Sequence, residues 1–160
     1  MEKSVLYYEC KESDNMIIAY RMAERCDGKL SPTEVVKIHF LHAEANDGKV
    51  LFTTNAKFPT KENREKINEI ILMTKDGSYA VMANIDGLGI FENQQPPQGY
   101  MVPSVWNDET KKDRGWFALR NVKEITIHRG DFVSLSGKDL LDSMNGDASM
   151  VYLDKQNLSF

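Results

Sequence analysis

The alternation of apolar and polar residues predicts a domain built mainly from β-strands. Two β-prone runs, 5–10 and 16–22, flank a cluster of turn-forming residues and therefore predict a hairpin. A second hairpin is expected around Asp76-Gly77, because this dipeptide tolerates the positive φ angles of a two-residue type I′ turn. Further strands are predicted at 49–55, 70–75, 78–85, 116–128, 131–135 and 150–153, with a bulge near Asn121.

Two segments carry helix signals. Ser31-Pro32-Thr33-Glu34 has the layout of a capping box and favours a helix over 32–44. The β-branched and aromatic residues that follow favour a strand instead, so both readings stay open. Near the other end, Ser136 is placed to cap a helix over 137–144 that stops at Asn145-Gly146. The charged run 61–66 suits a short exposed helix or a loop.

Residues 88–110 form a long segment with several Gly, Pro and Gln residues and no consistent period. Loops of this length are uncommon inside a compact domain and often carry function. Neither an internal repeat nor a linker divides the chain, so one domain over 1–160 is expected. The predicted fold class is α+β: a small mixed or antiparallel barrel with two or three peripheral helices.

Composition places the chain among ordinary globular proteins, with 41% hydrophobic and 28% charged residues. Its apolar runs are too short to span a bilayer, and the first residues show no secretory signal. Cys10 and Cys26 are the two cysteines, and free buried thiols in a reducing compartment are the favoured interpretation. The sequence thus predicts a cytoplasmic protein with no membrane partner, and it indicates neither a metal nor a cofactor.

The net charge of −4 argues against broad affinity for nucleic acid, which normally requires a basic surface. The charge is unevenly spread, however. Six cations and two anions lie in 111–129, which leaves the remainder of the chain strongly acidic. One segment could therefore favour an anionic partner, and the acidic remainder could face a basic one.

Catalytic motifs are missing from the sequence. There is no Gly-x-Ser-x-Gly elbow, no P-loop and no complete dinucleotide fingerprint. His39 and His42 would share a face if 32–44 is a helix, but no third ligand follows at a defined spacing. We therefore expect ordinary core or surface histidines, no catalytic residues and a binding role rather than an enzymatic one.

One constellation suits ligand binding. Trp106 lies in the long loop, and Trp116 enters the next strand between Arg114 and Arg120. Indole rings can stack on nucleobases while guanidinium groups bind phosphates. A tryptophan that enters a strand is more often part of the core, so a structural role for Trp116 remains the competing interpretation.

Three stretches in order resemble the PUA-like superfamily, especially its EVE and YTH-type members. These are the run 48–55, the hairpin 70–83 and the strand that begins Trp116-Phe117-Ala118-Leu119, and the resemblance covers about residues 48–153. It implies a barrel whose pocket receives a modified nucleobase between aromatic walls. The positions that match are Trp116 and, with less support, Trp106 and Thr54-Asn55.

Two functions follow as hypotheses. The first is a non-catalytic reader of a modified nucleobase or nucleotide that uses Trp106, Trp116, Arg114, Arg120, Thr54 and Asn55. The alternative is a protein-interaction or inhibitor module whose acidic face docks on a basic partner. A small enzyme ranks third, and the sequence is silent on the oligomeric state.

Overall fold

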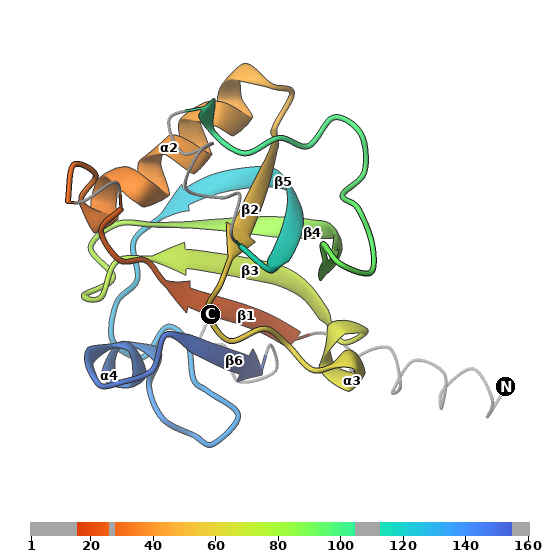
Figure 1. Cartoon of the computed structure of the whole chain (residues 1–160). Helices are drawn as coiled ribbons and strands as arrows, with labels where there is room; N and C mark the ends of the chain where they lie inside the picture. Colours follow the sequence, from red (N-terminus) through yellow and green to blue (C-terminus); the bar gives the residue numbers. More distant parts are fainter. Residues whose placement is uncertain (1–15, 26–27, 105–112, 155–160) are drawn as a thin grey trace, which may run out of the picture.

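The computed structural model describes residues 16–25, 28–104 and 113–154. Within these ranges, six strands and three helices follow one another (Figure 1). In order, these elements are β1 (Met16–Arg21), α2 (Pro32–Ala45), β2 (Lys49–Thr54), α3 (Lys61–Arg64), β3 (Ile67–Met73), β4 (Ala80–Ile90), β5 (Gly115–Ile125), α4 (Leu140–Asn145) and β6 (Met150–Asp154).

All six strands belong to one sheet with the order β2-β5-β4-β3-β1-β6. Only the β1–β3 pair is parallel, and the other pairs are antiparallel. The sheet does not close, because β2 and β6 are its two edges and do not pair with each other. The α+β, strand-rich fold is therefore confirmed, whereas the expected barrel is not supported.

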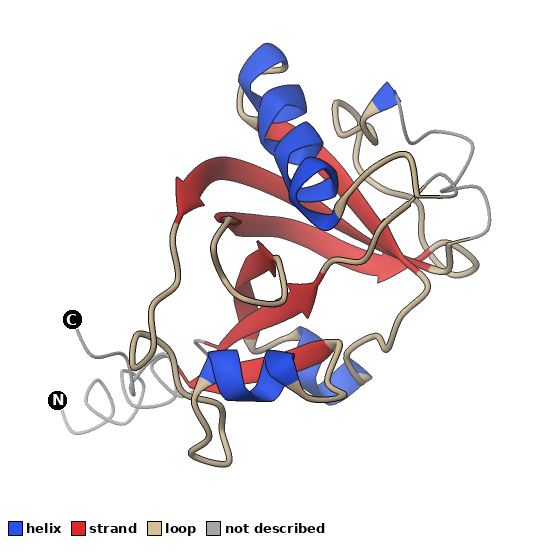
Figure 2. Ribbon diagram, turned by 90° about the vertical axis from the view of Figure 1, so that its left-hand side faces the viewer, coloured by secondary structure: helices blue, strands red, loops and turns tan. Residues whose placement is uncertain are grey.

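The two faces of the sheet are covered differently. Helix α2 lies across one face, where Tyr20, Phe52 and Phe117 contribute to the largest apolar cluster (Figure 2). On the opposite face, α4 and the chain before it cover β1 and β3. The loop after β4 covers Leu51 and Trp116 on that same face, closer to β2. Within the described residues, no helix is long and apolar enough to cross a membrane.

The helical reading of 32–44 is the correct one. Ser31 accepts a hydrogen bond from the Glu34 amide, and the Glu34 carboxylate accepts one from the Ser31 amide, which completes the capping box. The β-branched residues Val35 and Val36 point to the sheet and are buried. Burial of this apolar stripe outweighs their weak preference for strands.

The hairpin between β3 and β4 is confirmed, but its predicted two-residue type I′ turn is wrong. The last paired residues are Met73 and Ala80. Of the two predicted turn residues, Asp76 and Gly77, only Gly77 has a positive φ. The Gly77 amide donates to the Thr74 carbonyl, which places Gly77 at the fourth position of the turn. Asp76 is instead used as a side-chain acceptor within the loop.

Three other local predictions are changed in the structure. β1 is hydrogen-bonded to β3 on one side and to β6 on the other, so both of its edges are paired. The predicted hairpin partner 5–10 lies outside the described residues. Segment 131–135 forms isolated bridges rather than a strand. Helix α4 is capped by Asp139, not Ser136, because the Asp139 carboxylate accepts from the Leu141 amide.

Two irregularities shape the β4–β5 pair. The expected bulge is present: Asn121 has a φ of +54°, and the register shifts between Met82 and Asn84 on the facing strand. A second shift, between Ile85 and Gly87, leaves Asp86 without an opposite residue. These bulges turn the Asp86 and Arg120 side chains toward each other.

Candidate functional site

Trp116, the central residue of the predicted aromatic site, is part of the core. Only 1% of its surface is exposed, and the indole Nε1 donates to the Gln94 carbonyl at 2.9 Å. Its ring lies against Gly89, where an added Cβ atom would be 2.9 Å from Cζ2. The loop after β4 covers the ring with Tyr100 and other apolar residues. The indole therefore presents no open face on which a base could stack.

Three other predicted residues do come together, at one end of the β2–β5 pair. Thr54 pairs with Gly115, so Asn55 and Arg114 follow at the same end of the sheet, and both are exposed. Thr54 is buried, and its hydroxyl accepts from the Ala56 amide at 3.0 Å. The Thr54 hydroxyl oxygen is thus already hydrogen-bonded within the turn that follows β2. Trp106 lies outside the described residues.

Arg120 lies near the middle of β5, at the other end of its pairing with β2 and away from this group. It pairs with Lys49 in the ladder, and its guanidinium donates to Asp86. The same carboxylate accepts from the Tyr100 hydroxyl, whose pKa is raised to about 12 by burial and by this hydrogen bond. Through these two hydrogen bonds, Asp86 holds Tyr100 of the loop after β4 against the sheet. Arg120 therefore has a structural role here.

The remaining cations of the basic segment are also dispersed. Arg129 donates to Asp142 at 2.6 Å and lies 3.9 Å from Asp139, so it is matched by the carboxylates of α4. Lys111 and Lys112 lie outside the described residues. Of the described cations in 111–129, Arg120 and Arg129 are thus each paired with carboxylates.

The two helix histidines do not form a site. His39 is fully buried between α2 and the sheet, where its Nδ1 lies 2.7 Å from the Val35 carbonyl oxygen. Burial lowers the pKa of His39 to about 4, so the ring is neutral near pH 7. His42 is partly exposed. No cluster of three metal-ligating side chains occurs within the described residues.

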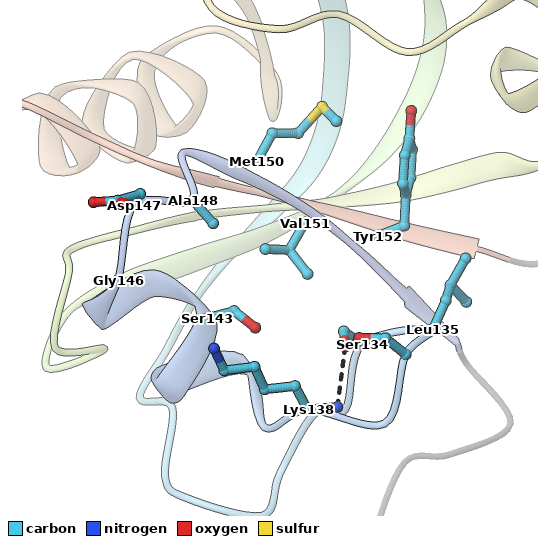
Figure 3. Close-up of a pocket in the computed structure, with 11 residues that line it drawn as sticks. Ser134, Leu135, Lys138, Ser143, Gly146, Asp147, Ala148, Met150, Val151 and Tyr152 are labelled. Carbon is cyan, nitrogen blue, oxygen red and sulfur yellow. Dashed lines mark hydrogen bonds between the residues drawn. The ribbon is translucent and has the colours of Figure 1, made fainter.

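A pocket of about 370 Å³ lies beside the edge strand β6, between that strand, α4 and the segment before α4 (Figure 3). We call it the β6-edge pocket. It is lined by Ser134, Leu135, Ser136, Lys138, Ser143, Gly146, Asp147, Ala148, Met150, Val151 and Tyr152.

Backbone groups of β6 face this pocket. The Arg21 amide donates to the Ser149 carbonyl, which fixes the alternation of the antiparallel β1–β6 ladder. The backbone N–H and C=O groups of Val151 and Leu153 point toward β1. Those of Met150 and Tyr152 therefore point to the outer edge of the sheet. Across the described residues that line the pocket, this edge receives one backbone hydrogen bond, from the Leu135 amide to the Tyr152 carbonyl at 3.3 Å.

The side chains around the pocket divide into an apolar and a polar side. Figure 3 shows Met150, Tyr152 and Leu135 on one side of the strand and Val151 on the other, facing Ser143 and Lys138. Leu135 is 54% exposed, which is high for a leucine. On the polar side, the Ser134 and Ser136 hydroxyl oxygens are 2.9 Å apart, and Ser134 Oγ accepts from the Lys138 amide.

Another hollow, of about 420 Å³, lies where the N-terminus of α2 meets the β3–β4 loop. Three of its polar residues form hydrogen bonds within that loop. Asp76 accepts from the Thr74 hydroxyl at 2.9 Å and from the Ser78 amide and hydroxyl at 3.0 and 2.8 Å. These bonds also hold the pKa of Asp76 below its usual value. The polar side chains of Thr74, Asp76 and Ser78 are thus bonded to one another within the loop.

Sequence reasoning did not find the β6-edge pocket. The strand at 150–153 was expected, but its position at the edge of the sheet depends on pairing with β1 more than a hundred residues earlier. The one local signal is Leu135, a large apolar residue within the serine- and glycine-rich run Ser134-Leu135-Ser136-Gly137.

Comparisons with protein-family models, curated proteins and solved structures found no match.

Proposed function

We propose that this chain is a binding module that takes an extended peptide segment of another protein as an added strand on β6. The observation that carries the proposal is the outer edge of β6 at Met150, which opens into a pocket, whereas the Tyr152 end of that edge is bonded to Leu135. The proposal falls in the protein-interaction class.

Edge strands usually carry protection against pairing with other chains, such as charges, proline or a covering element. On β6 the cover is short: Leu135 bonds to Tyr152, and the pocket begins beside that bond. A peptide laid there could donate to the Met150 carbonyl and accept from the Met150 amide. Main-chain bonds of this kind provide affinity, and alternate side chains provide specificity.

The nucleobase hypothesis stays a prediction. Of its two aromatic walls, Trp116 is covered by the loop after β4, and Trp106 lies outside the described residues. The predicted cations Arg114 and Arg120 lie at opposite ends of the β2–β5 pairing. We therefore prefer the strand edge, where the Met150 amide and carbonyl have no backbone partner among the described residues.

The test uses a proline substitution on β6. Because the Met150 amide points away from β1, Met150→Pro removes an outer donor and leaves the β1–β6 hydrogen bonds in place. Random nonapeptides displayed on phage would be selected against the unmodified protein, and synthetic versions titrated by fluorescence polarisation. Met150→Ala is the matched control, since it shortens the side chain but keeps the amide.

We expect selected peptides to bind the Met150→Ala protein and to lose at least about fivefold in affinity on Met150→Pro, as one backbone hydrogen bond contributes about 1 kcal/mol. A second measurement does not depend on how the variant folds: methylation of alternate peptide nitrogens should weaken binding to the unmodified protein. Failure to select any peptide, or equal binding of methylated and unmethylated peptides, would contradict the proposal.

A further inference from the structure

The segment between β5 and α4 contains a short loop that ends against β6. We call residues 132–140 the edge loop. Its base is held by the bridge between Val133 and Asp139 and by the Leu140 amide, which donates to the Phe132 carbonyl at 3.0 Å. Phe132 and Leu140 are also buried in the apolar cluster on the α4 side of the sheet. The base is therefore fixed by the core and by bonds within the loop.

The tip of the edge loop runs beside β6 for two residues and then turns away. Ser134 forms an isolated antiparallel bridge with Leu153, and the Leu135 amide donates to the Tyr152 carbonyl. The Gly137 amide then donates back to the Ser134 carbonyl, and Gly137 has a φ of +90°, so the chain turns before it reaches the start of β6. The loop thus takes the place of the first residues of an antiparallel neighbour of β6.

The tip is weakly held on β6. The hydrogen bond from the Leu135 amide to the Tyr152 carbonyl is 3.3 Å long, beyond the usual limit of about 3.2 Å for such bonds. Leu135 is 54% exposed, so its side chain buries little apolar surface in this position. Residues 136–138 are exposed as well. Displacing the Leu135 amide therefore breaks a long hydrogen bond and exposes little additional apolar surface.

From these contacts we infer that the edge loop is an internal competitor for β6: a segment that pairs with both Met150 and Tyr152 binds by displacing Leu135. The inference rests on the proposed function, because it needs a strand on the β6 edge. At Tyr152 one amide donor replaces another, and at Met150 the segment forms bonds for which the described residues provide no backbone partner.

The consequence is a site whose affinity is regulated by its own loop. A segment that needs the Tyr152 position binds only to molecules in which the loop has left it, and the apparent affinity falls in proportion to that fraction. When no partner is present, the loop covers part of an edge that would otherwise pair with other chains.

Removal of the competing donor tests the inference. Leu135→Pro deletes the amide that bonds to Tyr152 and keeps an apolar side chain. Leu135→Ala is the matched control, because it shortens the side chain and retains the amide. The probes are nonapeptides selected on phage against the Leu135→Pro protein and, in parallel, against the unmodified protein. Fluorescence polarisation should show at least about fivefold tighter binding to Leu135→Pro than to the unmodified protein, with Leu135→Ala within about twofold of the unmodified protein.

A second measurement uses the unmodified protein and does not depend on how the variant folds. Amide hydrogen exchange is followed by nuclear magnetic resonance with and without a saturating peptide. The Met150 amide should exchange more slowly with peptide bound, because it gains a partner, and the Leu135 amide should exchange faster, because it loses one. The Ser134 amide, which donates to the Lys138 carbonyl at 2.8 Å, should keep its rate.

The outcomes separate this inference from the proposed function. If the peptides slow exchange at Met150 but not speed it at Leu135, and Leu135→Pro binds them no more tightly than the unmodified protein does, the loop is not a competitor while strand addition stands. If neither protein selects a peptide, the proposed function fails as well.

Discussion

The buried imidazole of His39 predicts a specific loss of stability in mild acid. The side chain is fully buried, its Nδ1 lies 2.7 Å from the Val35 carbonyl oxygen, and its ring packs edge-on against Phe52. Burial lowers its folded-state pKa to about 4, against an ordinary value of 6.5 in the unfolded chain. The folded protein therefore holds this group neutral in a range where the unfolded chain binds a proton.

The direction in which the free energy of unfolding changes with pH follows from this difference in pKa. As the pH falls below the unfolded-state value, the unfolded chain takes up the proton first, so the free energy of unfolding decreases until the folded-state pKa is reached. The contribution of neutral His39 to the free energy of unfolding is fully present above about pH 6.5 and is lost progressively toward about pH 4. Between pH 7.5 and pH 5 the pKa difference corresponds to a loss of about 2 kcal/mol.

Urea unfolding followed by circular dichroism at pH 7.5, 6.5, 5.5 and 5 measures this loss. In His39→Gln the amide can still donate to the Val35 carbonyl but does not titrate, so the variant should lose most of the pH dependence whatever its stability at pH 7.5. His128→Gln is the control, because His128 is exposed. An unchanged slope in His39→Gln, or a flat profile for the unmodified protein over this range, would refute the reasoning.

Two further predictions concern packing and capping. Gly89→Ala should destabilise the fold by about 1–3 kcal/mol, because the new methyl group would lie 2.9 Å from the Trp116 ring, whereas Gly87→Ala, at 3.6 Å from the same ring, should change the unfolding free energy by less than about 1 kcal/mol. Thermal unfolding of the pair checks this, and equal destabilisation would count against the close contact. Ser31→Ala should cost about 1 kcal/mol through loss of the helix cap, and Thr33→Ala, in the exposed first turn, should cost clearly less in the same assay.

Local sequence signals were sufficient for most elements of this fold. The capping box at Ser31, the strand over 49–54, the bulge at Asn121 and the final strand all depend on neighbouring residues, whose backbone preferences act over a few positions. The hairpin at Asp76-Gly77 was also found, although its turn type was wrong. There the Asp76 side chain binds Thr74 and Ser78 within a longer loop, which a dipeptide rule does not describe.

What only the tertiary structure decided is how the strands are ordered and which groups that order leaves accessible. β1 pairs with β3 and β6 rather than with a neighbouring hairpin strand, so the sheet stays open and β6 becomes an edge. The same long-range pairing places Trp116 under the loop after β4. The sequence of a strand determines which of its residues alternate between the two faces, whereas packing over the whole chain determines which strands pair. In this protein, the strand pairing determines where a ligand can bind.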